Sequence, residues 1–268
     1  LVHEAIERSL LALREGHTLS EASLIEDTVR QMRAEWKGSR AGHYREIPKR
    51  PSLFEHEYGV PVRDSEWRAL RDHLVRCLRN FHRLPVLTEI KRTPTERWIF
   101  IEDIGSFPFE GTRVFTAPDF GYWNGDDRLQ LLDWKTGGSG DGAGLQLGGY
   151  ALYALEVLGV DLARVDLLEI NLREAKVTSH PWDEVSLDRV REHIRLSVRS
   201  MKAYLKDPDL NLAEESGFEK TEELRICRWC NFRAVCRPDL APFSSPSPET
   251  PSPASPGSPS PLQGERVG

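Results

Sequence analysis

The order of helical and extended patterns limits the folds open to this chain of 268 residues. Amphipathic helical patterns are predicted twice within residues 1–37 and again over 64–81, 145–158 and 187–205. Strand-like stretches bounded by Gly, Pro, Asn or Asp are 86–91 with 98–104, 113–120, 128–134, 165–172 and 175–179. This αβββαβ order predicts an α/β fold in which a mixed sheet is flanked by helices.

Charge and composition bound the class of protein. Hydrophobic residues make up 39% of the chain, enough for one substantial core, and the formal charge is −6. A protein of this net charge does not have a positively charged surface overall, so contact with nucleic acid would depend on a local basic groove. Interleaved basic residues and tryptophans could supply phosphate contacts and stacking faces there, although dispersed basic residues are typically solvated surface. They are Arg45, Lys49, Arg50, Arg92, Arg97, Arg225, Arg228 and Arg233, with Trp98, Trp123, Trp134 and Trp229.

The apolar runs and the first residues of the chain indicate its cellular location and whether its N-terminus is present. No apolar run reaches the roughly 18 residues that span a bilayer, and the start lacks the layout of a secretion signal. We therefore expect a cytoplasmic protein with no membrane partner. The first residue is Leu1, inside a helical pattern that has no capping residue before it, so we expect an N-terminal piece to be absent.

Two aspartates and a lysine stand at the ends of neighbouring predicted strands. Asp133 and Lys135 flank Trp134, and alternate residues of a strand face the same side, so both should project into one cleft. Asp119, at the end of the preceding strand, can join them. Carboxylates that hold Mg²⁺ or Mn²⁺ polarise a phosphoryl group and activate water, and a nearby lysine can orient that water. The pattern predicts phosphodiester hydrolysis.

An isolated D-x-K has a simpler explanation, a surface ion pair at a strand end with Asp119 capping a turn. The context here is more specific, because a Gly-rich turn at 137–142 leads into a helix that carries Gln146 and Tyr150. These two side chains are four residues apart on one helix face, so both can reach the cleft. Tyr150 could equally be a packing residue.

The segments Ala117-Pro118-Asp119-Phe120, Leu132-Asp133-Trp134-Lys135-Thr136-Gly137 and Gln146-x-x-x-Tyr150 together resemble the RecB-like branch of the PD-(D/E)XK nucleases. The resemblance implies a restriction-endonuclease-like core with Asp119, Asp133, Lys135, Gln146 and Tyr150 as catalytic-site residues. It also implies a metal ligand on the first helix, which His3 fits. The implied metal-binding set is His3, Asp119, Asp133 and Trp134. Glu89 is a weaker candidate, with an ordinary strand residue as its alternative.

Three of the four cysteines are clustered in the pattern C-x2-C-x5-C, at Cys227, Cys230 and Cys236. Thiolates this close are typical ligands of zinc or of an iron–sulfur cluster, although buried structural thiols are the alternative. Zinc would need a fourth ligand nearby, and the segment offers none.

Similarity to AddB nuclease domains and to CRISPR-adaptation exonucleases implies a [4Fe–4S] cluster whose remaining cysteine would lie upstream of Leu1. Cys77 is the internal alternative, but its place in an amphipathic helix predicts a core residue.

We therefore expect three parts. Residues 1–205 would form the nuclease domain, truncated at its N-terminus, and 206–242 would form an iron–sulfur cysteine segment packed on it as a metal-cluster appendage. Residues 243–268, rich in Pro and Ser, would be a disordered tail.

The expected activity is that of a Mg²⁺- or Mn²⁺-dependent DNA exonuclease acting on ends or single strands in repair or recombination, with a helicase or recombination partner. The alternatives are a CRISPR spacer-adaptation nuclease and a catalytically silent DNA-binding or scaffold subunit with the nuclease fold. A zinc-ribbon module attached to an unrelated α/β domain is a further alternative.

Overall fold

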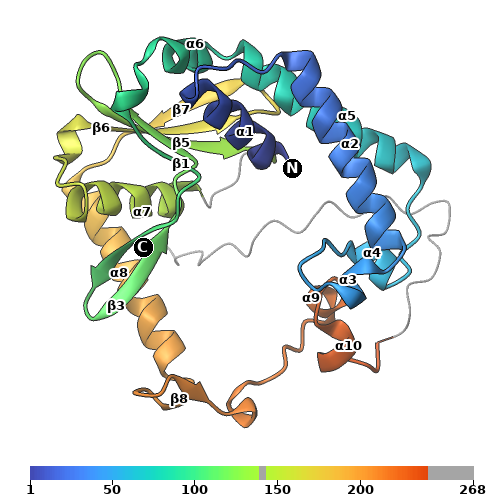
Figure 1. The fold of residues 1–268 in the computed structure, drawn as a ribbon. Coiled ribbons are helices and arrows are strands. Elements are labelled where there is room, and N and C mark those ends of the chain that lie inside the picture. Colours follow the sequence, from blue (N-terminus) through green and yellow to red (C-terminus); the bar gives the residue numbers. More distant parts are fainter. Residues whose placement is uncertain (139–142, 241–268) are drawn as a thin grey trace, which may run out of the picture. The chain divides into compact units, whose positions relative to one another are not determined.

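The computed structural model describes residues 1–138 and 143–240, shown as coloured ribbon in Figure 1. These residues form two units. The first consists of residues 1–31 and 68–191, and the second consists of 32–67 and 192–240.

A five-stranded mixed sheet is the centre of the first unit, with strand order β1-β4-β5-β6-β7. Only β5 and β6 run parallel; the other neighbours are antiparallel. A parallel pair needs a crossover, which contains helix α7 (Ala143–Glu156). The strands are β1 (Trp98–Ile101), β4 (Phe120–Trp123), β5 (Leu129–Lys135), β6 (Val165–Asn171) and β7 (Lys176–His180).

Helices cover both faces of this sheet (Figure 1). On one face Trp134 of β5 is 1% exposed and meets Phe81 of α5 edge-on, with ring centroids 5.6 Å apart. On the other face Tyr150 of α7 reaches β5 at Asp133. Six of the seven β5 residues are buried, which explains its nearly continuous apolar sequence. The other helices with residues in this unit are α1 (Val2–Arg14), α2 (Glu21–Arg40), α5 (Asp64–Arg83), α6 (Pro85–Arg92) and α8 (Glu184–Lys202).

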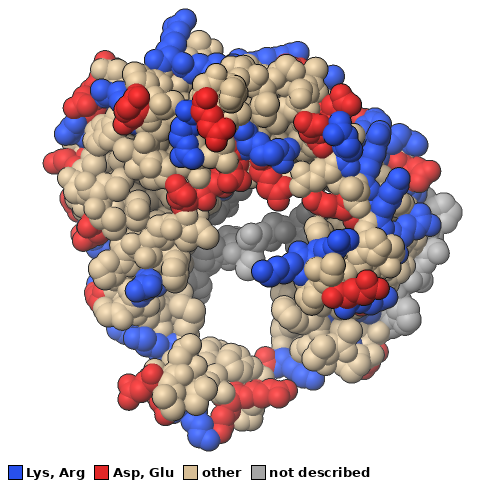
Figure 2. Space-filling model, in the orientation of Figure 1, with Lys and Arg blue, Asp and Glu red and all other residues tan. Residues whose placement is uncertain are grey.

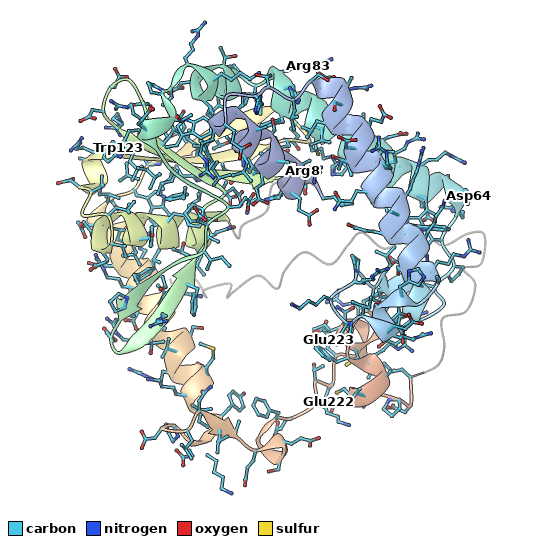
Figure 3. The ribbon with its side chains drawn as sticks, viewed as in Figure 1. Arg8, Asp64, Arg83, Trp123, Glu222 and Glu223 are labelled. Atoms are coloured by element: carbon cyan, nitrogen blue, oxygen red, sulfur yellow. The ribbon has the colours of Figure 1, made fainter. Side chains whose placement is uncertain are left out.

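The first two helices are held together by polar side chains. Arg8 of α1, labelled in Figure 3, donates to Thr28 Oγ1 and Gln31 Oε1 of α2, both at 3.2 Å. Ser20 caps the start of α2, since its Oγ accepts a hydrogen bond from the Ser23 amide at 3.1 Å. These contacts fix α1, which carries His3.

Residues 86–91 are helical, so the strand predicted there is wrong. Leu84 has an extended backbone, and Pro85 begins α6 at a position where proline's fixed φ favours a helix. Val86, Leu87 and Ile90 are buried at helical spacing. The β-branched residues of this stretch favoured a strand locally, but packing of the amphipathic face decided the structure.

The predicted strand over 113–120 is also corrected, because two separate strands share this stretch. Strands β2 (Gly105–Phe109) and β3 (Thr112–Thr116) pair as a hairpin apart from the main sheet, and β4 begins only at Phe120. The hairpin turns at Glu110 and Gly111, whose φ angles are 46° and 77°. Both values are left-handed, as a tight hairpin turn requires. Glutamate is an unusual residue for that position, so the turn carries a weak sequence signal.

The second unit contains short elements and the cysteine segment. Two of its helices lie between residues 40 and 61. The cysteine segment packs on them, since the Tyr58 hydroxyl donates to the Asn231 carbonyl at 2.7 Å. The elements are α3 (His43–Glu46), α4 (Phe54–Glu57), β8 (Leu205–Asp207), β9 (Leu212–Ala213), α9 (Leu224–Arg228) and α10 (Arg233–Cys236). The 3₁₀ helices within the described residues are η1 (Thr95–Arg97), η2 (Leu162–Arg164) and η3 (Glu215–Gly217).

The mixed α/β fold with helices on its sheet is confirmed. The division into parts over 1–205 and 206–242 stays a prediction. The predicted tail over 243–268 and residues 139–142 of the Gly-rich turn lie outside the described residues. Within the described ranges, no helix has both the length and the apolar character needed to cross a membrane.

Candidate active site

Strands β4 and β5 bring the two predicted aspartates together. Their register pairs Phe120 with Leu132, which places Asp119, just before β4, opposite Asp133. The Asp119 amide also donates to the Leu132 carbonyl at 3.2 Å. Opposed residues on antiparallel strands have side chains on the same face. Asp119 is 6% exposed and Asp133 is 1% exposed, so both carboxylates are removed from bulk water.

A chain of polar contacts links Asp133 to the crossover helix. Lys135 Nζ lies 2.7 Å from Asp133 Oδ2 and donates to Gln146 Oε1 at 2.6 Å. Gln146 Nε2 donates to the Tyr150 hydroxyl at 2.6 Å, and that hydroxyl lies 3.0 Å from both Asp133 Oδ1 and the Ala117 carbonyl. The structure therefore brings Asp133, Lys135, Gln146 and Tyr150 into one network.

Asp119 belongs to a second group, formed with α1 and the end of β1. His3 Nδ1 lies 3.3 Å from Asp119 Oδ1 and 3.4 Å from Glu102 Oε1. One ligand atom from each of these three residues lies within 4.8 Å of the others. An imidazole and two carboxylates at this spacing are a suitable ligand set for a divalent cation.

Glu102 is the site residue that the sequence analysis missed. It directly follows β1, has a left-handed φ of 52°, and its amide donates to the Asp119 carbonyl at 2.9 Å. A non-glycine residue in this region of backbone space costs energy and is frequent at functional sites. Glu89, the weaker candidate, is exposed on α6 and belongs to neither of the two groups.

Unsatisfied carboxylate oxygens indicate that the site fits a cation. Glu102 Oε1 and Asp133 Oδ2 are buried and accept no hydrogen bond within the described residues. Lys135 Nζ lies 2.7 Å from Asp133 Oδ2 and His3 Nδ1 lies 3.4 Å from Glu102 Oε1, and both contacts are ion pairs without a hydrogen bond. Buried anionic oxygens without donors are costly unless a cation compensates them. The residues present therefore fit a bound divalent ion.

Electrostatics at the two groups agree with this geometry. The neighbouring carboxylates, Asp119 first and then Glu102, raise the pKa of His3 from 6.5 to about 10. Burial raises the pKa of Asp119, although His3 opposes that shift. Burial and the charges of Asp133 and Asp119 also raise the pKa of Tyr150, so its hydroxyl keeps its proton and can donate to a carboxylate.

Trp134 reaches the site only through its backbone. Its amide donates to Asp119 Oδ2 at 2.5 Å, while its indole packs against Phe81 on the opposite face of the sheet. Any contribution of Trp134 to metal binding would therefore come from the main chain.

The clustered cysteines lie in the second unit. Cys227 is 7% exposed on α9, whereas Cys230 and Cys236 are half-buried, and all three are free thiols. The Phe232 amide donates to Cys230 Sγ at 3.4 Å. The three Sγ atoms do not all lie within 4.8 Å of one another, whereas thiolates on one tetrahedral zinc ion stand about 3.8 Å apart. Cys77 is fully buried in α5, which confirms its prediction as a core residue.

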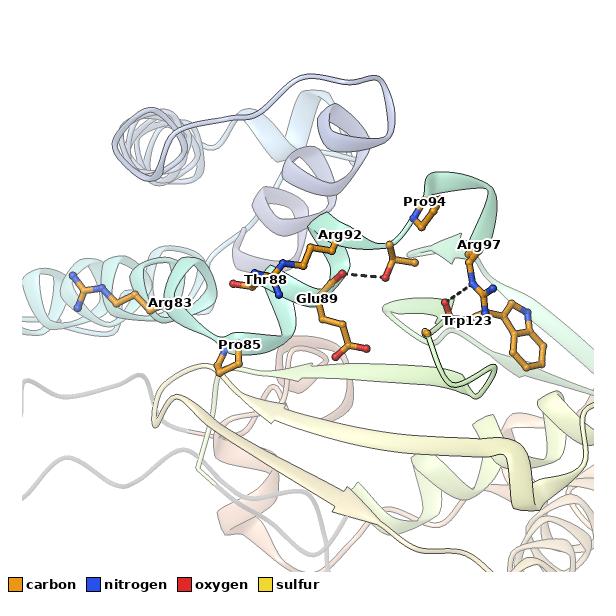
Figure 4. A pocket seen from close by; sticks show the side chains of 10 residues that line it. Arg83, Pro85, Thr88, Glu89, Arg92, Pro94, Arg97 and Trp123 are labelled. Carbon is orange, nitrogen blue, oxygen red and sulfur yellow. Dashed lines mark hydrogen bonds between the residues drawn. The ribbon is translucent and has the colours of Figure 1, made fainter.

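A pocket of about 920 Å³ lies along α6 and contains none of the predicted catalytic residues (Figure 4). It does bring Arg92, Arg97 and Trp123 together. Arg97 donates to the carbonyls of Trp123 and Asn124 at 3.1 and 2.6 Å, so this arginine holds the turn between β4 and β5. We place the chemistry at the carboxylates, because among the described residues they combine burial and convergence with buried oxygens that accept no hydrogen bond.

Comparison with known proteins gives one match over most of the chain. A family model described as the PD-(D/E)XK nuclease superfamily matches residues 1–237. No curated protein matches. Among solved structures, the crystal structure of SSO0001 is similar over 66% of this chain and 80% of that one, with 14% identity. Its TM-score of 0.29 is too low to establish a shared fold.

Proposed function

Because the chain belongs to the PD-(D/E)XK nuclease superfamily, we propose that it hydrolyses DNA phosphodiester bonds at the carboxylate cluster of β1, β4 and β5. Nucleases of this superfamily use divalent metals such as Mg²⁺ or Mn²⁺, and DNA is the substrate that the nuclease fold implies. The observation that carries the proposal is the convergence of His3, Glu102 and Asp119 beside Asp133 and Lys135.

Each residue has a distinct part in this proposal. His3, Glu102 and Asp119 would hold the ion, with Asp133 completing the set from the opposed position on β5. The bound ion would polarise the phosphoryl group and lower the pKa of the attacking water. Lys135 would orient that water and balance the charge that develops on the phosphate. Gln146 would position the Lys135 ammonium, and Tyr150 would position the Asp133 carboxylate.

Cleavage assays with matched variants test this proposal. Labelled single-stranded and duplex DNA would be incubated with Mn²⁺ and the wild type, Asp133→Asn or Lys135→Ala. The control is Asp126→Asn, the same chemical change at an exposed turn. We expect cleavage by the wild type and the control and almost none by the two site variants. Equal cleavage by all four proteins would exclude this site, and DNA binding without cleavage by any would support a scaffold role.

We further propose that the enzyme is an exonuclease acting on ends or single strands in repair or recombination. A CRISPR-adaptation role in trimming spacer precursors is the alternative, and the two roles differ in the genes that would lie beside this one. Circular and linear single strands of the same sequence test the mode of cleavage. Preferential loss of the linear strand would support exonuclease action, and equal loss would contradict it.

We also propose a [4Fe–4S] cluster at Cys227, Cys230 and Cys236. Their close sequence spacing, the free thiols and the amide donated to Cys230 Sγ support this, and a four-iron cluster holds its thiolates farther apart than zinc does. A reducing compartment, for which we expect the cytoplasm, would suit these thiols. Anaerobically purified protein containing iron and sulfide would support the cluster, whereas colourless protein containing only zinc would contradict it.

A further inference from the structure

The β2–β3 hairpin has one buried and one exposed face. Phe107 is 1% exposed, and the Gly105 backbone lies so close to the Tyr153 ring that a Cβ there would be 2.6 Å from it. This face therefore packs on α7. On the other face Phe115 is 66% exposed, and Ile104, immediately before β2, is 76% exposed. Figure 2 shows a largely uncharged surface over this hairpin.

Strand register assigns the exposed residues to a single face. Ser106 pairs with Phe115 and Pro108 pairs with Arg113, and alternate residues of a strand share a face. Ile104, Pro108 and Phe115 thus form an apolar strip beside Arg113. Arg113 is exposed and has no ion pair or hydrogen-bond partner within the described residues. Large exposed apolar side chains gathered on one face typically mark a binding surface.

Both ends of the hairpin lead into the candidate active site. Strand β2 begins at Gly105, soon after Glu102, and β3 ends at Thr116, shortly before Asp119. Between β3 and Asp119, the Ala117 carbonyl accepts a hydrogen bond from Tyr150. A molecule lying on the exposed face would therefore extend along a strand that leads directly to the carboxylates.

We propose that this face is a stacking platform for the bases of a single DNA strand whose backbone enters the active site. Bases stack on aromatic side chains whatever their identity, and apolar residues such as Ile and Phe can wedge between bases. Arg113 supplies the charge that a neighbouring phosphate requires. Paired bases in a duplex have their faces covered, so the platform selects unpaired strands. This inference rests on the proposed nuclease function and specifies its substrate.

Binding measurements with the cleavage-deficient Asp133→Asn protein as the common background test the platform. Phe115→Ala should weaken binding of a short oligothymidylate by about 5- to 150-fold, the range for losing one stacked base. Phe115→Trp should retain the affinity, because it keeps an aromatic face. Val185→Ala, which removes another exposed apolar side chain, on α8, should have no effect. A 2-aminopurine base in the strand should lose fluorescence on binding, and Phe115→Ala should reduce that loss.

Salt dependence separates the two kinds of contact. Arg113→Gln should lower the slope of log affinity against log salt by about 0.7, the value for one phosphate on a single strand. Phe115→Ala should weaken binding without changing that slope, because stacking releases no counterions. A general folding defect would instead alter both quantities and the thermal midpoint, which is measured for each variant.

Three results would overturn the platform. They are unchanged affinity and fluorescence in Phe115→Ala, a wild type that binds only duplex DNA, and a dimer that this variant dissociates, which would show a second copy on the face. These outcomes are independent of whether the protein cleaves DNA. If the wild type cleaves DNA but Phe115→Ala does not weaken binding, the proposed nuclease function stands and the platform is excluded. If Phe115→Ala weakens binding but the wild type does not cleave DNA, the platform stands and the proposed nuclease function is excluded.

Discussion

Removal of the Tyr150 hydroxyl tests how the crossover helix controls the β5 carboxylate. The hydroxyl accepts from Gln146 Nε2 at 2.6 Å and lies 3.0 Å from Asp133 Oδ1 and from the Ala117 carbonyl. It has one proton to donate, so it serves one of these two oxygens at a time. Tyr150 is only 2% exposed. Tyr150→Phe keeps the buried ring and deletes only these contacts.

The magnitude follows from what the deletion leaves behind. A hydrogen bond to a charged group contributes about 1.5–3 kcal/mol, and the Gln146 amide would lose its acceptor. We therefore expect Tyr150→Phe to lower the free energy of unfolding by about 2 kcal/mol, or roughly 4–8 °C in the thermal midpoint. Without the Tyr150 hydroxyl, the Asp133 carboxylate is also held less firmly in position for metal binding. Loss of such a supporting contact reduces activity about 10- to 100-fold.

Tyr153→Phe is the matched control. It deletes a hydroxyl one turn further along α7, where that hydroxyl makes no hydrogen bond within the described residues. Calorimetry and Mn²⁺-dependent cleavage would be measured for both variants. Equal midpoints and equal rates for the two would refute the argument that the Tyr150 hydroxyl positions Asp133.

Three further predictions concern packing, metal binding and pH. Gly148→Ala should cost about 1–3 kcal/mol in unfolding experiments, because its Cβ would lie 2.5 Å from Val190, whereas Gly149→Ala has open space and should not destabilise. Glu102→Gln should weaken Mn²⁺ binding by calorimetry about 10-fold or more, and equal affinity to that of the exposed-site control Asp103→Asn would contradict this. The pKa of His3 in the folded state is raised from 6.5 to about 10. The stabilisation of the folded protein by protonated His3 is therefore complete below pH 6.5 and is lost as the pH rises through 10. The midpoint of metal-free protein should fall over that window, and His3→Asn should flatten the fall.

Local patterns were sufficient to predict much of the site. Asp133 and Lys135 alternate on one strand, and Gln146 and Tyr150 are four residues apart on the following helix, so side-chain periodicity predicts that each pair shares a face. The structure brings all four together. Asp119 was predicted as well, at the end of a strand over 113–120, although the structure places it just before β4.

Glu102 could not be predicted in the same way. Its place beside Asp119 depends on the pairing of β1 with β4, and the whole β2–β3 hairpin lies between them in sequence. No local pattern reports that pairing. The one available signal was an acid directly after the apolar stretch Trp98–Ile101, and that stretch had been extended through residue 104.

The errors in the fold have similar causes. The stretch at α6 contains β-branched residues that favour a strand, yet its buried face and Pro85 determine a helix. The hairpin was missed because its turn uses Glu110 where Asn or Asp is usual. In both places a tertiary or backbone requirement outweighed the intrinsic preference of the residues.

A crystal structure of the protein grown with Mn²⁺ tests the central claim most directly, because anomalous scattering locates the ion without reference to activity. We predict a peak within about 2.0–2.6 Å of oxygens from Asp119 and Asp133 and close to His3. A fully occupied manganese ion elsewhere, with these two carboxylates free of it, would contradict the account.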